Sequence, residues 1–457
     1  MTQYLTLKKK NFLNKNPEIA ICLSFVGTIL IGTFLLNLPF ATKPGFKISL
    51  FDCFFTASST VCISGVVIYD TFTHWSFFGQ LVILILTQLG ALGVITFYSI
   101  FAIYLNKKIN LKNMKVVGDQ ISTSVFANFK SVFKNVLHIT LFFEFFGGLA
   151  LCFMFYPKFK SYGIFMAFFT AISAYCNAGL DLNGIIAPDC SFIPFSHNYF
   201  SLTIVSILTI AGGLGFIVIH EIIELKKQHK KLKFLSIHSK LALCSTTILI
   251  VLGSLIFFVL EIENSLANSN LFDSIFTSFF HSISARSNGF LTLNLNNLTN
   301  LTKTFICALM LIGGCPSGTG GGIKTTTFSI IFATTINTVK NCNHVSLFKH
   351  KIKETDVYKA ISTLFITITT IATASILIYK FENLIELPTI IFSVISVLSN
   401  TGFQTVPILN FNIYSKIVFI FLMLIGRIGL LSFTSTFFKK RNSKVKLTLP
   451  ESKIQVN

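Results

Sequence analysis

Long apolar stretches separated by short polar segments run from residue 19 to residue 438. Most of them reach the roughly 20 residues that an α-helix needs to cross the hydrocarbon core of a membrane. One stretch is interrupted by a run of glycines and has two halves. The pattern predicts eight membrane spans, at residues 19–38, 81–104, 137–156, 202–219, 241–260, 305–312 with 328–336, 361–379 and 417–438.

Four shorter apolar segments lie within successive pairs of spans. They are too short to cross a membrane and too apolar for free loops, and they cover residues 50–66, 163–180, 272–290 and 388–403. Each aligns on one glycine, with a phenylalanine ten residues before it: Gly65 with Phe55, Gly179 with Phe169, Gly289 with Phe279 and Gly402 with Phe392. The glycines are 114, 110 and 113 residues apart, which predicts four copies of one unit.

Each predicted unit consists of a span, a half-crossing pore segment, a glycine turn and a second span. Because each unit enters and leaves on the same side, the units are parallel. We therefore predict an all-α polytopic membrane protein with four helix–pore segment–helix repeats, eight transmembrane helices in all, around a central pore. The repeats are expected at residues 19–110, 130–228, 238–340 and 356–440, with end segments at residues 1–18 and 441–457.

The four glycine strips are expected to meet at the centre. Non-helical backbone at membrane depth is tolerated only where it is buried in protein or lines a water-filled path. Glycine lets the strip turn its carbonyl oxygens inward, and rings of carbonyls can replace the water shell of a monovalent cation such as K⁺. The alternative is four re-entrant packing hairpins without an ion path. The predicted filter residues are Cys62, Ile63, Ser64, Gly65, Cys176, Asn177, Ala178, Gly179, Arg286, Ser287, Asn288, Gly289, Ser399, Asn400, Thr401 and Gly402.

Basic residues outnumber acidic ones by 37 to 17, which gives a net charge of +20. In a soluble protein this charge would suggest nucleic acid, but only 12% of the residues are charged and 52% are hydrophobic. The basic residues gather at both ends and in alternate loops, at residues 105–136, 220–240 and 339–359. The positive-inside rule therefore places both termini in the cytoplasm, and we expect contact with anionic membrane lipid and not with nucleic acid.

The four glycine strips, the string from Gly313 to Thr327 and the string Gly426-Arg427-Ile428-Gly429 together resemble the Trk/Ktr/HKT superfamily of potassium transporters. The resemblance covers residues 17–440 and favours the bacterial Ktr-type membrane subunit, because only about 18 residues precede the first span. It implies potassium uptake across the bacterial cytoplasmic membrane. It also implies a gating loop in the second helix of the third repeat and a pore-facing arginine at Arg427.

The same resemblance bears on selectivity. Some plant members with serine at the first-repeat glycine prefer sodium, so Gly65 implies potassium. Cys62-Ile63-Ser64 stands where a triplet rich in Val and Thr is usual, and Asn288 stands where a small residue is usual. The alternative is therefore a sodium-permeable transporter of the same architecture, with K⁺ or Na⁺ as the transported ion.

The string at residues 313–327 contains six glycines and Pro316, which cannot sustain an α-helix. A nucleotide P-loop would need Lys directly after the last glycine, and here Ile323 intervenes. We interpret the string as a gate, with a packing kink as the alternative. Arg427 is expected to face the pore, the alternative being a structural ion pair or snorkelling. The gate residues are Gly314, Gly318, Gly320, Gly321, Gly322, Lys324 and Arg427.

Five other charged residues lie in or beside the apolar segments. Glu144 is interpreted as a helix-packing hydrogen-bond partner or as part of the transport path. Arg286 is expected to anchor its strip through carbonyl or carboxylate contacts. Asp52, Asp181 and Asp273 flank the pore segments, where they attract cations or, for Asp52 and Asp273, cap helices.

No set of residues indicates an enzyme or an organic cofactor. The ten cysteines form no C-x-x-C pair, and His220-Glu221 lacks the second histidine of a zinc helix. Four parallel units with one glycine-rich break also differ from the inverted repeats of secondary transporters. A flexible gate without a sensor suggests a regulatory partner. The resemblance implies a homodimer above a cytoplasmic ring of nucleotide-binding (RCK/KTN-type) subunits.

Overall fold

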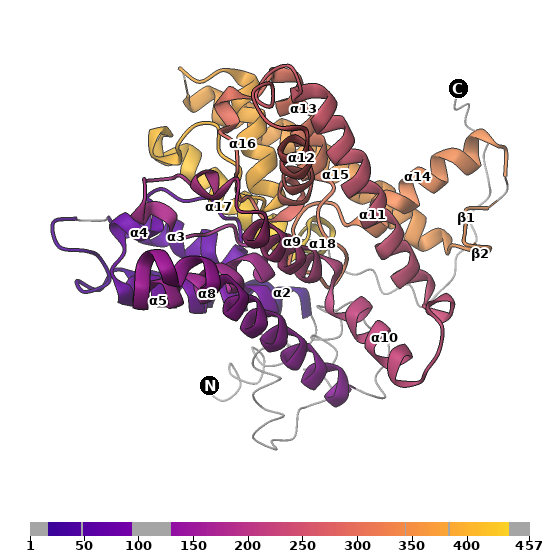
Figure 1. Ribbon diagram of the computed structural model, residues 1–457. Helices are drawn as coiled ribbons and strands as arrows, with labels where there is room; N and C mark the ends of the chain where they lie inside the picture. The colour runs from indigo at the N-terminus through magenta and orange to yellow at the C-terminus, as the bar shows by residue number, and fades with distance from the viewer. Residues whose placement is uncertain (1–16, 47–48, 94–128, 343, 383, 438–457) are drawn as a thin grey trace, which may run out of the picture.

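The computed structural model describes residues 17–46, 49–93, 129–342, 344–382 and 384–437 (Figure 1). Most of the expected amino-terminal segment 1–18, the first repeat beyond residue 93 and the tail 441–457 lie outside the described residues. The described chain is helical except for loops and one two-stranded hairpin.

The helices follow the predicted order. The first unit contains α2 (Pro17–Leu36), α3 (Leu50–Cys62), α4 (Thr71–His74) and α5 (Phe77–Leu92). The second contains α8 (Phe129–Cys176), α9 (Tyr199–Leu214) and α10 (Phe216–Lys227). The third contains α11 (Ile237–Glu261), α12 (Leu271–Ser287), α13 (Asn300–Leu311) and α14 (Thr325–Val339), and the fourth contains α15 (Glu354–Phe381), α16 (Leu387–Ser399), α17 (Ile413–Ile428) and α18 (Leu430–Phe437).

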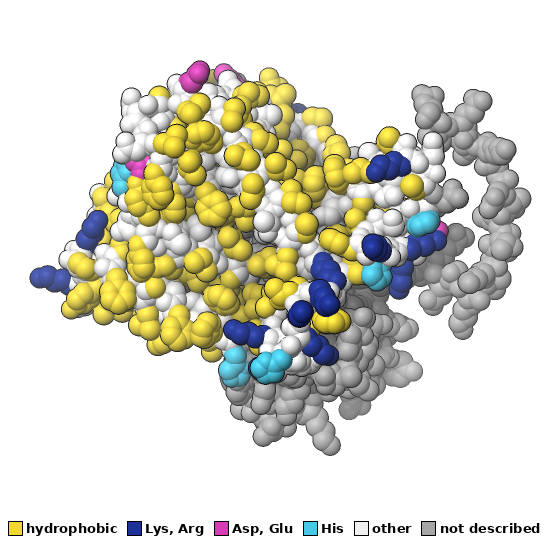
Figure 2. All heavy atoms as spheres, turned by 45° about the vertical axis from the view of Figure 1, so that its right-hand side comes forward, with side chains coloured by type: hydrophobic (Ala, Val, Ile, Leu, Met, Phe, Trp, Pro, Cys, Tyr) yellow, Lys and Arg dark blue, Asp and Glu magenta, His cyan; other side chains and the backbone are white. Residues whose placement is uncertain are grey.

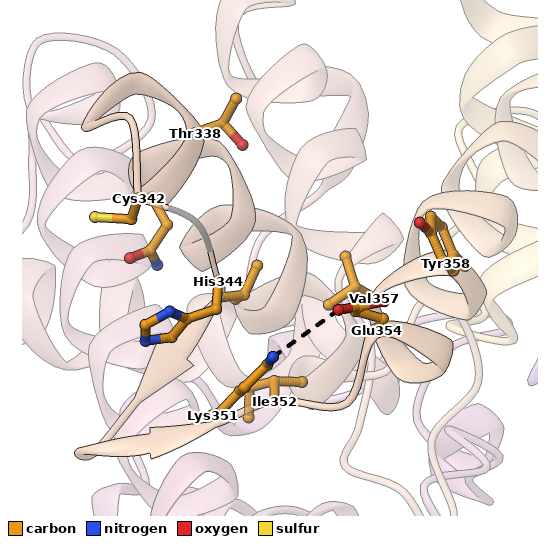
Figure 3. A pocket seen from close by; sticks show the side chains of 10 residues that line it. Thr338, Cys342, His344, Lys351, Ile352, Glu354, Val357 and Tyr358 are labelled. Carbon is orange, nitrogen blue, oxygen red and sulfur yellow. Dashed lines mark ion pairs between the residues drawn. The ribbon is translucent and has the colours of Figure 1, made fainter. Parts of the chain in front are cut away.

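Shorter elements complete the connections. Strands β1 (Ser346–Leu347) and β2 (His350–Lys351) pair between α14 and α15. This hairpin borders a cavity of about 270 Å³ beside the end of α14 (Figure 3). Two of the residues that line the cavity form an ion pair, with Lys351 Nζ 3.9 Å from Glu354 Oε1. Single 3₁₀ turns occur at η2 (Asn183–Ile185), η3 (Ile193–Phe195), η4 (Leu232–Phe234), η5 (Leu295–Asn297) and η6 (Ile408–Asn410).

Polar residues define where the helices begin. Ser49, Ser76 and Ser236 each accept a backbone N–H from the first turn of α3, α5 and α11, which satisfies donors that a helix leaves unpaired. Two carboxylates join the outer ends of neighbouring helices. Glu261 accepts the Thr299 N–H (2.9 Å) at the start of α13, and Glu382 accepts the Asn412 N–H (2.7 Å) at the start of α17.

A backbone break divides α8 into a long first part and the predicted pore segment. Lys160 has φ 51° and ψ −132°, and Pro157 precedes it. Gly163 lies so close to the Phe155 carbonyl that a side chain there would collide with it. The pore segment predicted from residue 163 is therefore a separate helical piece that ends at Cys176.

The units pack against one another in chain order and close into a ring. Helix α5 contacts α8, α9 contacts α12, α13 contacts α16, and α17 contacts α3 of the first unit. In Figure 1, α9, α12 and α18 lie near the middle of the view, while α10, α14 and the β1–β2 hairpin project away from it.

Three described helices are long and apolar enough to cross a membrane: α11, α15 and residues 135–176 of α8. The pair α9 and α10, bent by 96° at Gly215, passes the same test when taken together. Exposed apolar side chains such as Val259 on α11 and Phe365 on α15 face outward, and Figure 2 shows hydrophobic side chains spread over most of the visible surface. The chain is thus an all-α polytopic membrane protein, while the count of eight spans stays a prediction.

Candidate functional site

The four aligned glycines form a closed ring of backbone contacts. All four have positive φ, from 67° at Gly179 to 88° at Gly402. A Cβ at each would meet a carbonyl oxygen of the next unit. It would collide at Gly65 with Ala178, at Gly179 with Asn288 and at Gly289 with Thr401, and it would be in tight contact, at 3.0 Å, at Gly402 with Ser64. Each of these carbonyls belongs to the residue directly before the next glycine. Each strip therefore contacts the strip of the next unit, and the strip of the fourth unit contacts that of the first.

Solvent accessibility has the same pattern in all four strips. Gly65, Gly179, Gly289 and Gly402 are partly accessible, whereas the three residues before each glycine and the residue after it are buried. The side chains of the predicted filter residues therefore point into the protein and leave backbone at the centre.

Three of the four strips share one local conformation. Ile63, Asn177 and Asn400, each two residues before its glycine, have left-handed φ of 58°, 57° and 53°. The next N–H in each strip returns to a serine carbonyl in the preceding helix, as Ser64 does to Ser59 at 2.8 Å. A β-branched residue in this region is strained by about 1–2 kcal/mol, so the conformation at Ile63 is held by the surrounding structure.

The third strip differs from the other three. Helix α12 continues through Ser287, and the N–H groups of both Asn288 and Gly289 donate to the Ser284 carbonyl. Arg286 lies in this last helical turn and donates to the Gly313 carbonyl at 3.2 Å. The predicted carbonyl contact of Arg286 is thus confirmed, but the carbonyl belongs to the 313–327 segment and not to the strip.

The second helix of the second, third and fourth units is interrupted, whereas the sequence predicted a single glycine-rich break. Gly93, Gly215 and Gly429 have φ of 77°, 87° and 94° at the ends of α5, α9 and α17. The signal was present as G-x-x-G in three units: Gly90 to Gly93, Gly212 to Gly215 and Gly426 to Gly429. The first glycine of each string packs against its own pore helix, at the carbonyls of Val61, Tyr175 and Leu398 respectively. The expectation of a single break was therefore wrong.

The longest interruption separates α13 from α14 and contains the predicted gate. Its base is closed by two backbone hydrogen bonds of 3.0 Å, from the Gly313 N–H to Ile323 and from the Ile323 N–H to Leu311. Its tip is fixed to the break of the second unit. The Cys315 N–H donates to Gly213 (2.8 Å) and the Thr319 N–H donates to Gly212 (3.1 Å).

Two cations bind adjacent carbonyls of this loop. Lys324 Nζ donates to the Gly320 carbonyl at 2.5 Å, and Arg427 Nη1 donates to the Thr319 carbonyl at 2.5 Å. Arg427 Nη2 also donates to Gly90 (2.6 Å) and Ala91 (2.9 Å) at the end of α5. Among the residues that the structure describes, no carboxylate forms an ion pair with Lys324 or Arg427. Arg427 therefore joins the fourth unit, the loop and the first unit through carbonyl groups.

Thr319 is the loop residue that touches a glycine strip through its side chain. Its hydroxyl lies 2.6 Å from the side-chain amide of Asn177 and donates to the Tyr175 carbonyl at 3.3 Å. Thr319 is 1% exposed. Thr319 was not identified from the sequence, because a threonine among six glycines carries no signal of its own.

The remaining charged residues have mainly structural partners. Glu144 is buried, and its carboxyl lies 3.9 Å from the Cys176 thiol, which fits the packing interpretation. Asp52 stands in the first turn of α3, where Ser49 is the N-cap, and Asp273 stands in the first turn of α12. Asp181 accepts the Asn183 N–H at 2.9 Å, beyond the second glycine.

Asp70 was not identified from the sequence. Its Oδ1 accepts the N–H groups of Phe72 (3.0 Å) and Thr73 (2.8 Å), and its Oδ2 accepts that of Asp189 (3.1 Å). Asp70 therefore caps α4 and joins the outer loops of the first and second units. The single signal was its position as a possible N-cap before Thr71.

Comparison with known proteins gives a consistent result. The family model described as TrkH, cation transport protein, matches residues 9–446. The chain is 32% identical to the Ktr system potassium uptake protein D of Bacillus subtilis, covering 92% of each chain. It is 28% identical to the potassium/sodium uptake protein NtpJ of Enterococcus hirae, covering 99% of this chain and 100% of the relative.

A solved structure shares the fold. The model superposes on the potassium transporter TrkH from Vibrio parahaemolyticus with a TM-score of 0.73 at 16% identity, covering 91% of this chain and 84% of the other. The family expected from the glycine strips is confirmed. The chain is a membrane transporter and not an enzyme, and it belongs to the TrkH family of cation transport proteins.

Proposed function

We propose that this chain carries potassium ions into the cell through the ring of four glycine strips. One observation carries the proposal: each glycine is accessible between buried neighbours and touches the carbonyl of the next strip, from the fourth back to the first. Carbonyl oxygens arranged in this way can replace the hydration shell of a monovalent cation. The names of the relatives support potassium, since the Bacillus subtilis relative is named as a potassium uptake protein and the Enterococcus hirae relative as a potassium/sodium uptake protein.

The ion-binding residues of the proposal are the sixteen strip residues named from the sequence, acting through their backbone. Glycine is present in all four strips, which favours K⁺. The alternative is a sodium-permeable transporter of the same architecture, because the Enterococcus hirae relative is named as a potassium/sodium uptake protein.

We infer that the loop at residues 313–327 is the gate. It touches the second strip through Thr319 and Asn177, and Lys324 and Arg427 hold its adjacent carbonyls. Hydrogen bonds that involve a charged group contribute about 1.5–3 kcal/mol each. Moving the loop aside therefore requires an opposing interaction of several kcal/mol. Deletion of residues 315–322, or Lys324→Ala, should raise ion flux without changing the preference for K⁺ over Na⁺.

A regulatory partner could supply that interaction. The Bacillus subtilis relative is named as part of a Ktr system, which supports a second component. We propose a homodimer in a bacterial cytoplasmic membrane with both termini inside, bound to a cytoplasmic ring of nucleotide-binding subunits. The four repeats at residues 19–110, 130–228, 238–340 and 356–440 are part of the same proposal.

Potassium-limited growth of an uptake-deficient bacterium tests the transport activity. The parent chain should restore growth, and Gly65→Ser should weaken its preference for K⁺ over Na⁺, because a Cβ at Gly65 would lie 2.5 Å from the Ala178 carbonyl. Gly27→Ser is the matched control, since nothing lies within 4 Å of a Cβ built there. Absence of K⁺ or Rb⁺ flux from a well-inserted, purified chain together with its partner would overturn the proposal.

A further inference from the structure

A basic and apolar patch covers the connection between α10 and α11. It comprises residues 226–234, and its exposed side chains include five lysines, at Lys226, Lys227, Lys230, Lys231 and Lys233. Between the lysines stand two large apolar side chains, Leu232 and Phe234, which are 63% and 61% exposed. Lys and Arg side chains gather at the lower right of Figure 2, on the side where Figure 1 places α10. Apolar side chains interleaved with lysines form a composition that a membrane interface favours.

The patch directly precedes a candidate membrane span. Helix α11, that span, begins at Ile237, three residues after Phe234, so the patch is expected near a membrane interface. Helix α10 turns by 96° from α9 at Gly215 and therefore runs nearly perpendicular to α9. Lysines at this level lie among phospholipid headgroups, and the neighbouring Leu232 and Phe234 can enter the acyl boundary.

The patch is held firmly on the fold at both ends. At one end Leu225 is buried, and at the other Leu235 is buried. Glu221 of α10 accepts the Ser236 N–H at 2.6 Å and the Ser236 hydroxyl at 2.8 Å, and it also accepts the Ser239 hydroxyl. A displacement of the patch would therefore also displace α10.

Helix α10 in turn contacts the proposed gate at its first residues. The Phe216 N–H donates to the Ser317 carbonyl at 3.3 Å. A Cβ at Gly215 would lie 2.6 Å from the Pro316 carbonyl, and Val218 packs with Cys315. A displacement of the start of α10 would therefore disturb its contacts with the loop.

We propose that residues 226–234 bind anionic phospholipid headgroups of the cytoplasmic leaflet and that α10 transmits this binding to the loop at residues 313–327. The second half of the proposal rests on the proposed gate. The five lysines supply the charge, and Leu232 and Phe234 supply apolar area that can enter the acyl boundary. Each lysine near an anionic surface contributes roughly a fivefold gain in affinity.

The binding step is tested on the intact purified chain. Native mass spectrometry compares retained phosphatidylglycerol and phosphatidylcholine in the parent, in the triple variant Lys230→Gln, Lys231→Gln, Lys233→Gln, and in a control triple. The control, Lys340→Gln, Lys349→Gln, Lys353→Gln, removes the same charge from exposed lysines beyond α14. The patch variant should retain about 10- to 100-fold less phosphatidylglycerol, and the control should match the parent. Equal retention in both triples would overturn the proposal.

The transmission step uses flux into vesicles of phosphatidylcholine with and without phosphatidylglycerol. The flux of the parent should depend on phosphatidylglycerol, and that of the patch triple should not. Deletion of residues 315–322 should give lipid-independent flux. If the deletion variant conducts K⁺ and the flux of the parent does not depend on phosphatidylglycerol, the proposed lipid site is contradicted and the transport function is supported. If no variant conducts in any vesicle, the transport function itself fails. Loss of a captured cytosolic protein by the patch triple, with unchanged lipid retention, would assign the patch to a protein partner instead.

Discussion

The hydroxyl of Thr319 lies 2.6 Å from the side-chain amide of Asn177, although the two residues are far apart in the chain. Asn177 belongs to the second glycine strip and has left-handed backbone, and Thr319 stands at the tip of the loop between α13 and α14. The loop and the strip therefore share one buried polar contact.

The first prediction concerns this contact. Thr319→Val keeps the shape of the side chain but leaves the Asn177 amide without its partner, which costs about 1–3 kcal/mol in a buried site. The closed position of the loop should lose that stabilisation, and K⁺ flux should rise about tenfold. Tracer flux in vesicles measures the change. Thr319→Ser retains the hydroxyl and should behave like the parent; equal flux from all three chains would show that the contact does not hold the gate.

Arg427 provides a second prediction, because one guanidinium reaches carbonyls of both the loop and α5. Arg427→Lys keeps the charge but has a single ammonium group that cannot reproduce the forked contacts. Arg427→Met removes both. Flux should increase from the parent to the lysine variant and again to the methionine variant.

The ratio of K⁺ to Na⁺ flux should stay constant across the Arg427 series, since the guanidinium contacts no strip carbonyl among those recorded in the described chain. A changed ratio would place Arg427 in the selective part of the path.

A third prediction compares two glycines at the break of the second unit. Gly215 has φ 87°, and its Cβ would collide with the Pro316 carbonyl of the loop, whereas Cβ contacts at Gly213 are ordinary, at 3.7 Å and longer. Gly215→Ala should displace the loop, cost about 1–2 kcal/mol in backbone strain and raise basal flux. Gly213→Ala is the matched control and should leave flux near that of the parent. The reverse order would contradict the proposed contact between the break and the gate.

A fourth prediction concerns pH at the outer loops. Burial lowers the pKa of His74, and this exceeds the opposing effect of Asp70 and Asp189. Because the pKa of His74 is lower in the folded state than in the unfolded state, protonation favours the unfolded state. Neutral His74 therefore contributes to the stability of the fold at neutral pH. This contribution is lost as the pH falls below about 6.5.

The measurement is the thermal midpoint of the purified chain between about pH 7.5 and 5.5. His74→Gln should show a smaller decrease on acidification than the parent. A parent and a His74 variant with identical pH profiles would exclude His74 as its source.

Much of the local structure follows from the amino-acid sequence. Apolar stretches of membrane length, and glycines at Gly65, Gly179, Gly289 and Gly402 with matched spacing, predicted the short helices α3, α12 and α16 and the second part of α8. The glycine-rich string predicted the break between α13 and α14. These features are readable because length, hydrophobicity and the absence of a Cβ act within one segment.

The contacts that join the units could not be predicted from the amino-acid sequence. Which carbonyl each glycine touches, how Arg427 reaches the end of α5, and why Thr319 meets Asn177 depend on segments more than a hundred residues apart. The breaks at Gly215 and Gly429 were visible as G-x-x-G, but a glycine pair in an apolar helix also serves close packing. The break at Gly215 lies against the Pro316 carbonyl of the third unit, and only the packing of the units brings these two segments together.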